Sequence, residues 1–142
     1  MANVKMGFEG LLYYGTAGST AATLLTNCQD IKFDLDVERG NTTVRGTSTS
    51  PPVKTSSVTA LVVGVEWTMI NDITDTALAA LKAAVGAGAG VALRGKDYTS
   101  GKGPDADFTL KMSNPCPLEG EQALTFTAEP CRDYGRSPSA YV

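Results

Sequence analysis

The chain has 142 residues, a length that fits a single domain spanning 1–142. Hydrophobic residues make up 42% and charged residues 19%, which is enough apolar surface for a folded core and too little charge for wholesale disorder. A net charge of −3 without a run of Lys or Arg argues against tight nucleic-acid binding, and the absence of histidine removes the commonest general base and metal ligand.

Neither a basic leader followed by an apolar run nor an apolar stretch of membrane-spanning length occurs in the sequence. We therefore expect a soluble, leaderless protein with no membrane segment. The same composition predicts that the protein is not an enzyme and uses no cofactor and no metal.

The first elements in chain order are predicted to be strands. Phe8–Gly15 is a short strand candidate, and the segment 16–29 is expected to be a loop or a weak helical turn. Asp30–Glu38 alternates without interruption between apolar and charged residues, which is typical of a strand with one dry face and one charged face. The apolar positions are Ile31, Phe33, Leu35 and Val37.

A polar segment, Gly40–Ser57, follows this strand and contains only two aliphatic residues in eighteen positions. We expect an extended hairpin with its tip at Gly46–Pro52. Such a segment is either a mobile surface loop or one that gains its order from a partner, and the residues alone leave both open.

The second half of the chain predicts four further elements. Val58–Ile70 is a long strand whose first half is apolar on both faces and is therefore expected to be covered on both. A helix is predicted from Thr74 or Asp75 as the N-cap to a stop at Gly86, followed by a strand at Val91–Tyr98. Ala106–Met112 and Ala123–Glu129 are expected to pair as a hairpin. The sum is a mainly β, antiparallel sandwich or barrel with one flanking α-helix and a long hairpin loop.

Three features invite a sharper chemical interpretation. Arg94–Asp105 contains glycines and lysines but lacks the helix that a phosphate-binding loop requires, so we expect a hairpin loop. The carboxylates on the charged face of Asp30–Glu38 lack the spacing of a calcium loop. Cys116 and Cys131 are expected to lie too far apart along a hairpin for a disulfide, leaving three free and mostly buried cysteines.

The order of these features resembles that of the tail tube, or major tail, proteins of long-tailed bacteriophages. The opening TNCQDIKFDLDVERGNTTVRG, the middle VGVEWTMI, DTALAALKAAV and VALRG, and the closing DFTLKMSNPCPLEGEQALTFTAEPC carry the likeness over Lys5–Pro130. The C-terminal tail, residues 131–142, and the three cysteines match nothing in that pattern.

The resemblance implies a structural virion protein that self-assembles into stacked, hexameric rings forming a hollow tail tube for genome passage and ejection. It would be made in the bacterial cytoplasm, reside in the virion tail, contact itself and other tail proteins, and let DNA pass without specific binding. The polar segment becomes an assembly arm that is disordered in the monomer and ordered in the polymer. The arm residues are Asn41, Thr42, Arg45, Gly46, Pro51, Pro52 and Lys54, and the acidic residues that could face the lumen are Asp34, Asp36 and Glu38.

Two alternatives from other classes remain open on the residues. One is a non-catalytic β-sandwich binding or adhesin module, which the missing signal peptide and the single tryptophan disfavour. The other is a small hydrolase that uses Asp and Glu alone, which normally needs a deeper cleft than a chain of this size provides.

Overall fold

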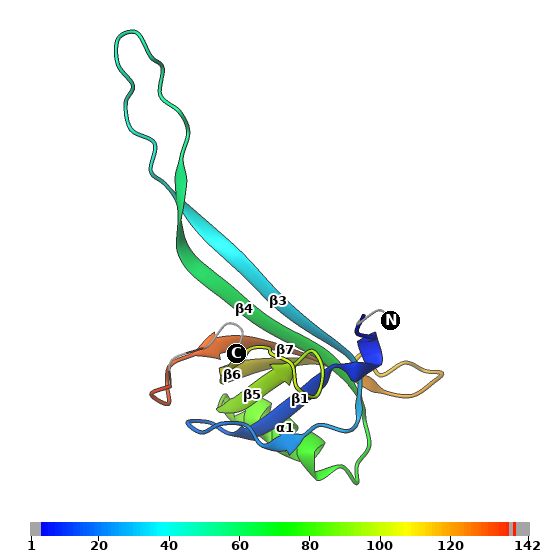
Figure 1. Ribbon diagram of the computed structural model, residues 1–142. Helices are drawn as coiled ribbons and strands as arrows, with labels where there is room; N and C mark the ends of the chain where they lie inside the picture. The colour runs from blue at the N-terminus through cyan, green and yellow to red at the C-terminus, as the bar shows by residue number, and fades with distance from the viewer. Residues whose placement is uncertain (1–3, 137, 139–142) are drawn as a thin grey trace.

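The protein folds around one antiparallel sheet, seen in a computed structural model that describes residues 4–136 and 138 (Figure 1). Within these residues seven strands pair in the order β2-β1-β5-β6-β7-β4-β3, and every pairing is antiparallel. The elements are η1 (Gly7–Glu9, a 3-10 turn), β1 (Leu11–Thr16), β2 (Thr23–Leu24), β3 (Cys28–Asn41), β4 (Ser56–Ile70), α1 (Thr76–Ala87), β5 (Gly90–Lys96), β6 (Asp105–Ser113) and β7 (Ala123–Cys131). The prediction of a mainly antiparallel β fold with one flanking α-helix is confirmed.

The sheet curls until its edge strand β3 meets the inner strand β5 across one face. The ring of Phe33, on the edge strand β3, lies against Gly95 on β5 so closely that a Cβ at Gly95 would collide with it. β6, β7 and β4 lie between these two strands in the sheet, so this contact requires strong curvature. The architecture is therefore one barrel-like sheet.

The enclosed face of the sheet, called here the core face, carries the hydrophobic core. Trp67 and Phe126 are register partners on β4 and β7, and their rings stack with centroids 5.2 Å apart. Leu78 and Leu81 of α1 are buried in the same cluster, so the helix covers this face, chiefly over β5 and β6. Burying large aromatic and aliphatic side chains in this way supplies most of the driving force for folding.

Helix α1 begins where the sequence indicated and ends slightly later. Asp75 is the N-cap, and its carboxylate accepts a hydrogen bond from the backbone N–H of Ala77 at 3.0 Å. The predicted stop at Gly86 is wrong, because Gly86 lies inside the helix and Gly88, with φ of +66°, provides the left-handed C-cap. Only the second glycine adopts the conformation that ends the helix.

The predicted hairpins on the body of the protein are confirmed. β6 pairs with β7 from Asp107 to Ser113, and β5 pairs with β6 across the turn that holds Gly101 and Gly103. The segment 16–29 differs from the prediction, because it contains the short strand β2, which pairs with β1 through Tyr13 and Leu24. Two residues of pairing are too few to leave a recognisable alternation in the sequence.

The β3–β4 hairpin is the most extended part of the fold and projects far beyond the body (Figure 1). We call the paired strands β3 and β4 the stem. The sequence predicts that one face of β3 is dry and that the first half of β4 is covered on both faces. Both predictions are wrong for the outer half of the stem, which lies next to the arm. Leu35 and Val37 are 50% and 40% exposed, and Val58, Leu61 and Val62 are exposed to a similar degree. The alternation predicts the strands correctly, but the body is too short to cover the whole stem.

Candidate assembly surface

The tip of the projecting hairpin, residues 42–55, is held together by threonine side chains in place of a regular ladder. The backbone N–H of Thr42 donates to the carbonyl of Thr55 at 3.1 Å, and the hydroxyls of the same two residues lie 2.8 Å apart. The N–H of Thr55 in turn donates to the hydroxyl of Thr43 at 3.0 Å. Below the tip, a register shift between Glu38 and Arg39 marks the place where the regular pairing changes.

The turn at the end of the arm requires glycine. At Gly46 a Cβ would collide with the carbonyl oxygen of Ser50 and the backbone of Pro51, so only a residue without a side chain lets the two strands approach. The N–H of Ser50 donates to the carbonyl of Thr47 at 3.3 Å and completes the turn. The arm residues predicted from sequence thus lie together on one projection.

The arm and the adjoining stem residues differ in charge from the rest of the protein. From Arg39 to Val65 the chain carries three cations, Arg39, Arg45 and Lys54, and no carboxylate. With 12 basic and 15 acidic residues in the whole chain, the remainder therefore has 9 basic and 15 acidic residues, a net charge of −6. In the part of the chain that the structure describes, no ion pair involves any of these three cations. The arm presents free positive charge.

An apolar stripe runs along the outer stem on the core face, beyond the reach of the core. Leu35 pairs with Val63 and Val37 pairs with Leu61, so their side chains project to the same side of the two strands. Three of these four residues, Leu35, Val37 and Leu61, are exposed. A contiguous apolar surface of this kind on a projecting element is typical of a protein–protein contact. The alternation in the sequence predicts core positions for these residues and gives no sign of this surface.

The opposite face of the stem, called here the polar face, carries the predicted acidic residues. Asp34, Asp36 and Glu38 pair with Gly64, Val62 and Ala60. The structure brings the three carboxylates to one side of β3, where all are exposed. Lys32 lies 3.7 Å from Asp34, an exposed contact of little energetic weight. An open groove continues beside Asp34 and Asp36 onto β7, where it is lined by Thr127 and Glu129.

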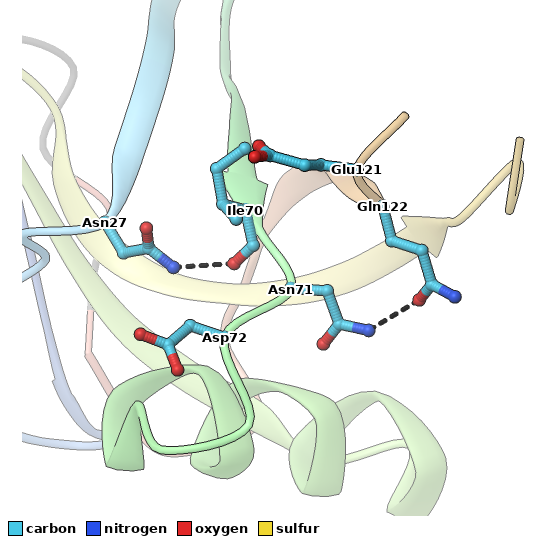
Figure 2. Close-up of a pocket in the computed structure, with 6 residues that line it drawn as sticks. All are labelled: Asn27, Ile70, Asn71, Asp72, Glu121 and Gln122. Atoms are coloured by element: carbon cyan, nitrogen blue, oxygen red, sulfur yellow. Dashed lines mark hydrogen bonds between the residues drawn. The ribbon is translucent and has the colours of Figure 1, made fainter. Parts of the chain in front are cut away.

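A polar pocket lies at the other end of the stem, where β3 begins and β4 ends (Figure 2). The side-chain amide of Asn27 donates to the carbonyl of Ile70 at 2.6 Å, and that of Asn71 donates to Gln122 Oε1 at the same distance. Lys82 Nζ of α1 donates to Asn71 Oδ1. The carboxylates of Asp72 and Glu121 complete the lining. We call these residues the foot pocket; no local sequence pattern predicted it.

Hydrogen bonds from Thr74, two residues further along the chain, stabilise the ionised form of Asp72. Its carboxylate accepts hydrogen bonds from the hydroxyl of Thr74 at 2.7 Å and from the backbone N–H of Thr74 at 3.0 Å. The hydroxyl and then the N–H favour the charged form and lower the pKa of Asp72 below its ordinary value. The pocket therefore holds a carboxylate that remains charged well below neutral pH.

A second site, which no local sequence pattern predicts, ties the end of the described chain to the sheet. Arg136 lies 2.9 Å from Asp105 and 3.4 Å from Asp107, and the Asp107 carboxylate also accepts the N–H of Gly18 at 3.0 Å. The N–H of Gly90 donates to the hydroxyl of Tyr134 at 2.9 Å. The segment after β7 thereby crosses the polar face of β5 and β6. We call it the C-terminal clasp; the rest of the tail prediction lies outside the described residues.

The cysteines are unpaired, as predicted, but are less buried than expected. Cys28 and Cys131 are half-buried and Cys116 is exposed on the loop between β6 and β7. Burial first, and then the negative charge of Asp75, raise the pKa of Cys28 to about 12. Among residues 4–136 and 138, no group of three or more His, Cys, Asp or Glu side chains could hold a metal ion. None of the helices described is long and apolar enough to cross a membrane.

Comparison with known proteins gives a match in structure alone. No protein-family model and no curated protein sequence matches the chain. A chain from the tail of an empty GTA particle, determined by helical refinement with C6 symmetry, superposes with a TM-score of 0.73. The match covers 96% of this chain and 98% of that chain at 11% sequence identity. The resemblance to tail proteins is thus confirmed at the level of the fold.

Proposed function

We propose that this chain is the structural subunit of a phage-type tail tube, in which copies form hexameric rings that stack into a hollow conduit for the genome. The observation that carries the proposal is the likeness, over almost the whole of both chains, to a tail chain arranged with C6 symmetry. A subunit of this kind resides in the virion tail after synthesis in the bacterial cytoplasm. Its partners are further copies of itself and other tail proteins.

The unsatisfied surfaces of the isolated chain support self-association. β3 is an edge strand of fourteen residues, and its outer edge has no partner within the described residues. Exposed edges of that length normally have to be covered, and neighbouring copies in a ring can do so without any additional element. The apolar stripe of Leu35, Val37 and Leu61 gains burial in the same contact.

The polar face of the stem is the surface we assign to the lumen. Its Asp34, Asp36 and Glu38 would repeat around a ring and give the conduit a negative wall, which repels phosphate and lets DNA slide without binding. The assignment needs no catalytic residue and no cofactor.

Labelling tests the lumen assignment. In a background with the native cysteines changed to serine, Asp36→Cys should react with a small maleimide in both monomers and tubes. A polymer-linked maleimide too large to enter a tube should react only with monomers. Equal labelling of tubes by both reagents would place this face on the outside.

Electron microscopy and light scattering of the purified chain test the proposed function itself. The expected result is rings with a central hole and tubes of uniform width, with a mass that rises in multiples of the ring. A chain that stays monomeric at high concentration would contradict the proposal and favour a self-contained binding module instead.

A further inference from the structure

The arm and the foot pocket lie at opposite ends of the same two strands. β3 starts directly after Asn27 and ends at Asn41, where the arm begins, and β4 returns from Ser56 to Ile70, directly before Asn71. Fourteen strand residues at about 3.3 Å each place the two surfaces roughly 45 Å apart along the stem. Figure 1 shows the arm at the far end of the hairpin from the body. A second copy displaced along the stem would bring its foot pocket to this arm.

The two surfaces have complementary charge. The arm offers Arg45 and Lys54, both exposed and without an ion pair among the described residues. The foot pocket offers the carboxylates of Asp72 and Glu121, and neither forms an ion pair with another described residue. The cation beside the pocket, Lys82, is directed to Asn71. Lysine and arginine side chains are therefore the groups that this pocket is suited to receive.

The pocket also offers hydrogen-bonding groups that match the composition of the arm. Asn27, Asn71 and Gln122 hold side-chain amides around the opening, as Figure 2 shows. The arm is rich in serine and threonine hydroxyls, which bind amides as donors or acceptors. The charges of Arg45 and Lys54 attract the pocket over a longer distance and guide the approach. Short polar contacts then fix the final position.

On the basis of the proposed function, we propose that the arm of one copy docks through Arg45 and Lys54 into the foot pocket of the next copy along the tube, against Asp72 and Glu121. The contact joins two unlike surfaces. A repeated head-to-tail contact does not close on itself when copies are displaced along an axis, so it produces an open filament. This contact therefore links successive rings, while the apolar stripe and the strand edges serve contacts within a ring.

A charge-exchange experiment tests this contact. The arm variant Arg45→Glu/Lys54→Glu and the foot variant Asp72→Lys/Glu121→Lys should each raise the critical concentration for tube growth at least about fivefold, because like charges then face each other. Both sets of changes in one chain should return it to within about twofold of the original value. Tube growth is measured by sedimentation and ring formation by light scattering and microscopy.

Matched variants keep the charge changes and move them off the contact. Glu119→Lys lies in the same loop as Glu121 but outside the pocket, and Lys102→Glu is an exposed charge reversal on the loop after β5. Both should leave tube growth unchanged, and thermal unfolding should show that all variants fold. Tube growth that stays impaired in the combined variant, or that is equal in every variant, would overturn the contact between the arm and the foot pocket. Either result would leave the proposed function intact. A wild-type chain that forms neither rings nor tubes would contradict the proposed function itself.

Discussion

The guanidinium of Arg136 lies 3.4 Å from the fully buried carboxylate of Asp107. The same guanidinium lies 2.9 Å from Asp105, so a single cation offsets two carboxylates on the polar face of β6. A buried carboxylate without a cation is costly, and this pairing explains why the segment after β7 stays on the sheet.

Removing that cation should destabilise the protein strongly. Arg136→Leu leaves Asp107 buried and unpaired, and we expect the free energy of unfolding to fall by about 3 kcal/mol. Urea unfolding measures the change. Arg132→Leu removes an exposed cation four residues earlier and should change stability by less than about 0.5 kcal/mol. Adding Asp107→Asn to Arg136→Leu should recover part of the loss, and no recovery would mean that the clasp acts by packing alone.

The contact between Phe33 and Gly95 predicts a steric effect. Gly95→Ala places a methyl group against the Phe33 ring, where β3 meets β5 across the core face, and should cost about 1–3 kcal/mol. Gly86→Ala is the matched change, because a Cβ there meets nothing within 4 Å and the residue lies inside α1. It should stabilise the protein by about 0.5–1 kcal/mol. Thermal and urea unfolding compare the two, and equal effects would show that the sheet is less curled than described.

The apolar stripe predicts a variant that folds but does not assemble. Leu61→Ser removes an apolar side chain that is 56% exposed in the isolated chain, so the stability of the monomer should change by less than about 1 kcal/mol. Burial in a ring makes the same side chain important for association, and ring formation should weaken about tenfold. Phe8→Ser changes a residue that is 85% exposed on η1, outside the stem and the foot pocket, and should assemble normally. Light scattering across a dilution series reads out both variants.

The pKa of Cys28 predicts a loss of stability at high pH. The pKa of this thiol has its ordinary value of 9.0 in the unfolded chain and rises to about 12 in the folded one. Between these values the folded state holds a proton that the unfolded state has lost, so unfolding becomes more favourable as the pH rises from about 9 to about 12. The stabilising effect is complete below pH 9. Cys28→Ala should show a shallower decline over this range, and parallel curves for the two proteins would refute the assignment.

Limited proteolysis tests the arm in a different way. Trypsin can cleave after Arg45 and Lys54, both of which are exposed. If the arm orders only on assembly, cleavage there should be fast in monomers and strongly suppressed in tubes. Mass spectrometry of the fragments identifies the sites, and cleavage after Lys102 serves as an internal reference on the body. Cleavage of the arm at an unchanged rate in assembled material would disprove its role in contacts between copies.

Much of the fold could be predicted because its signals are local. The alternation in Asp30–Glu38 and Val58–Ile70 identifies β3 and β4, and Asp75 marks the start of α1 through an interaction two residues away. The same alternation cannot distinguish a side chain facing the core from one facing a neighbouring molecule. For that reason it predicts core positions for Leu35 and Leu61, although the body does not extend far enough to cover them.

The remaining surfaces depend on residues that are distant in the chain. Arg136 and Asp107 meet only because the chain turns back after β7, and nothing near either residue indicates the other. The foot pocket joins Asn27, Asn71 and Gln122 from three loops, each an ordinary loop residue in its own segment. The positively charged arm, by contrast, is visible in the sequence once charges are counted from Arg39 to Val65.

The separation of arm and foot pocket along one hairpin gives every subunit a direction. When such subunits add one after another, the growing polymer ends in bare arms on one side and in empty pockets on the other. The two extremities then need different caps, so an initiating complex built to fit only one of them fixes both where growth starts and which way the conduit points.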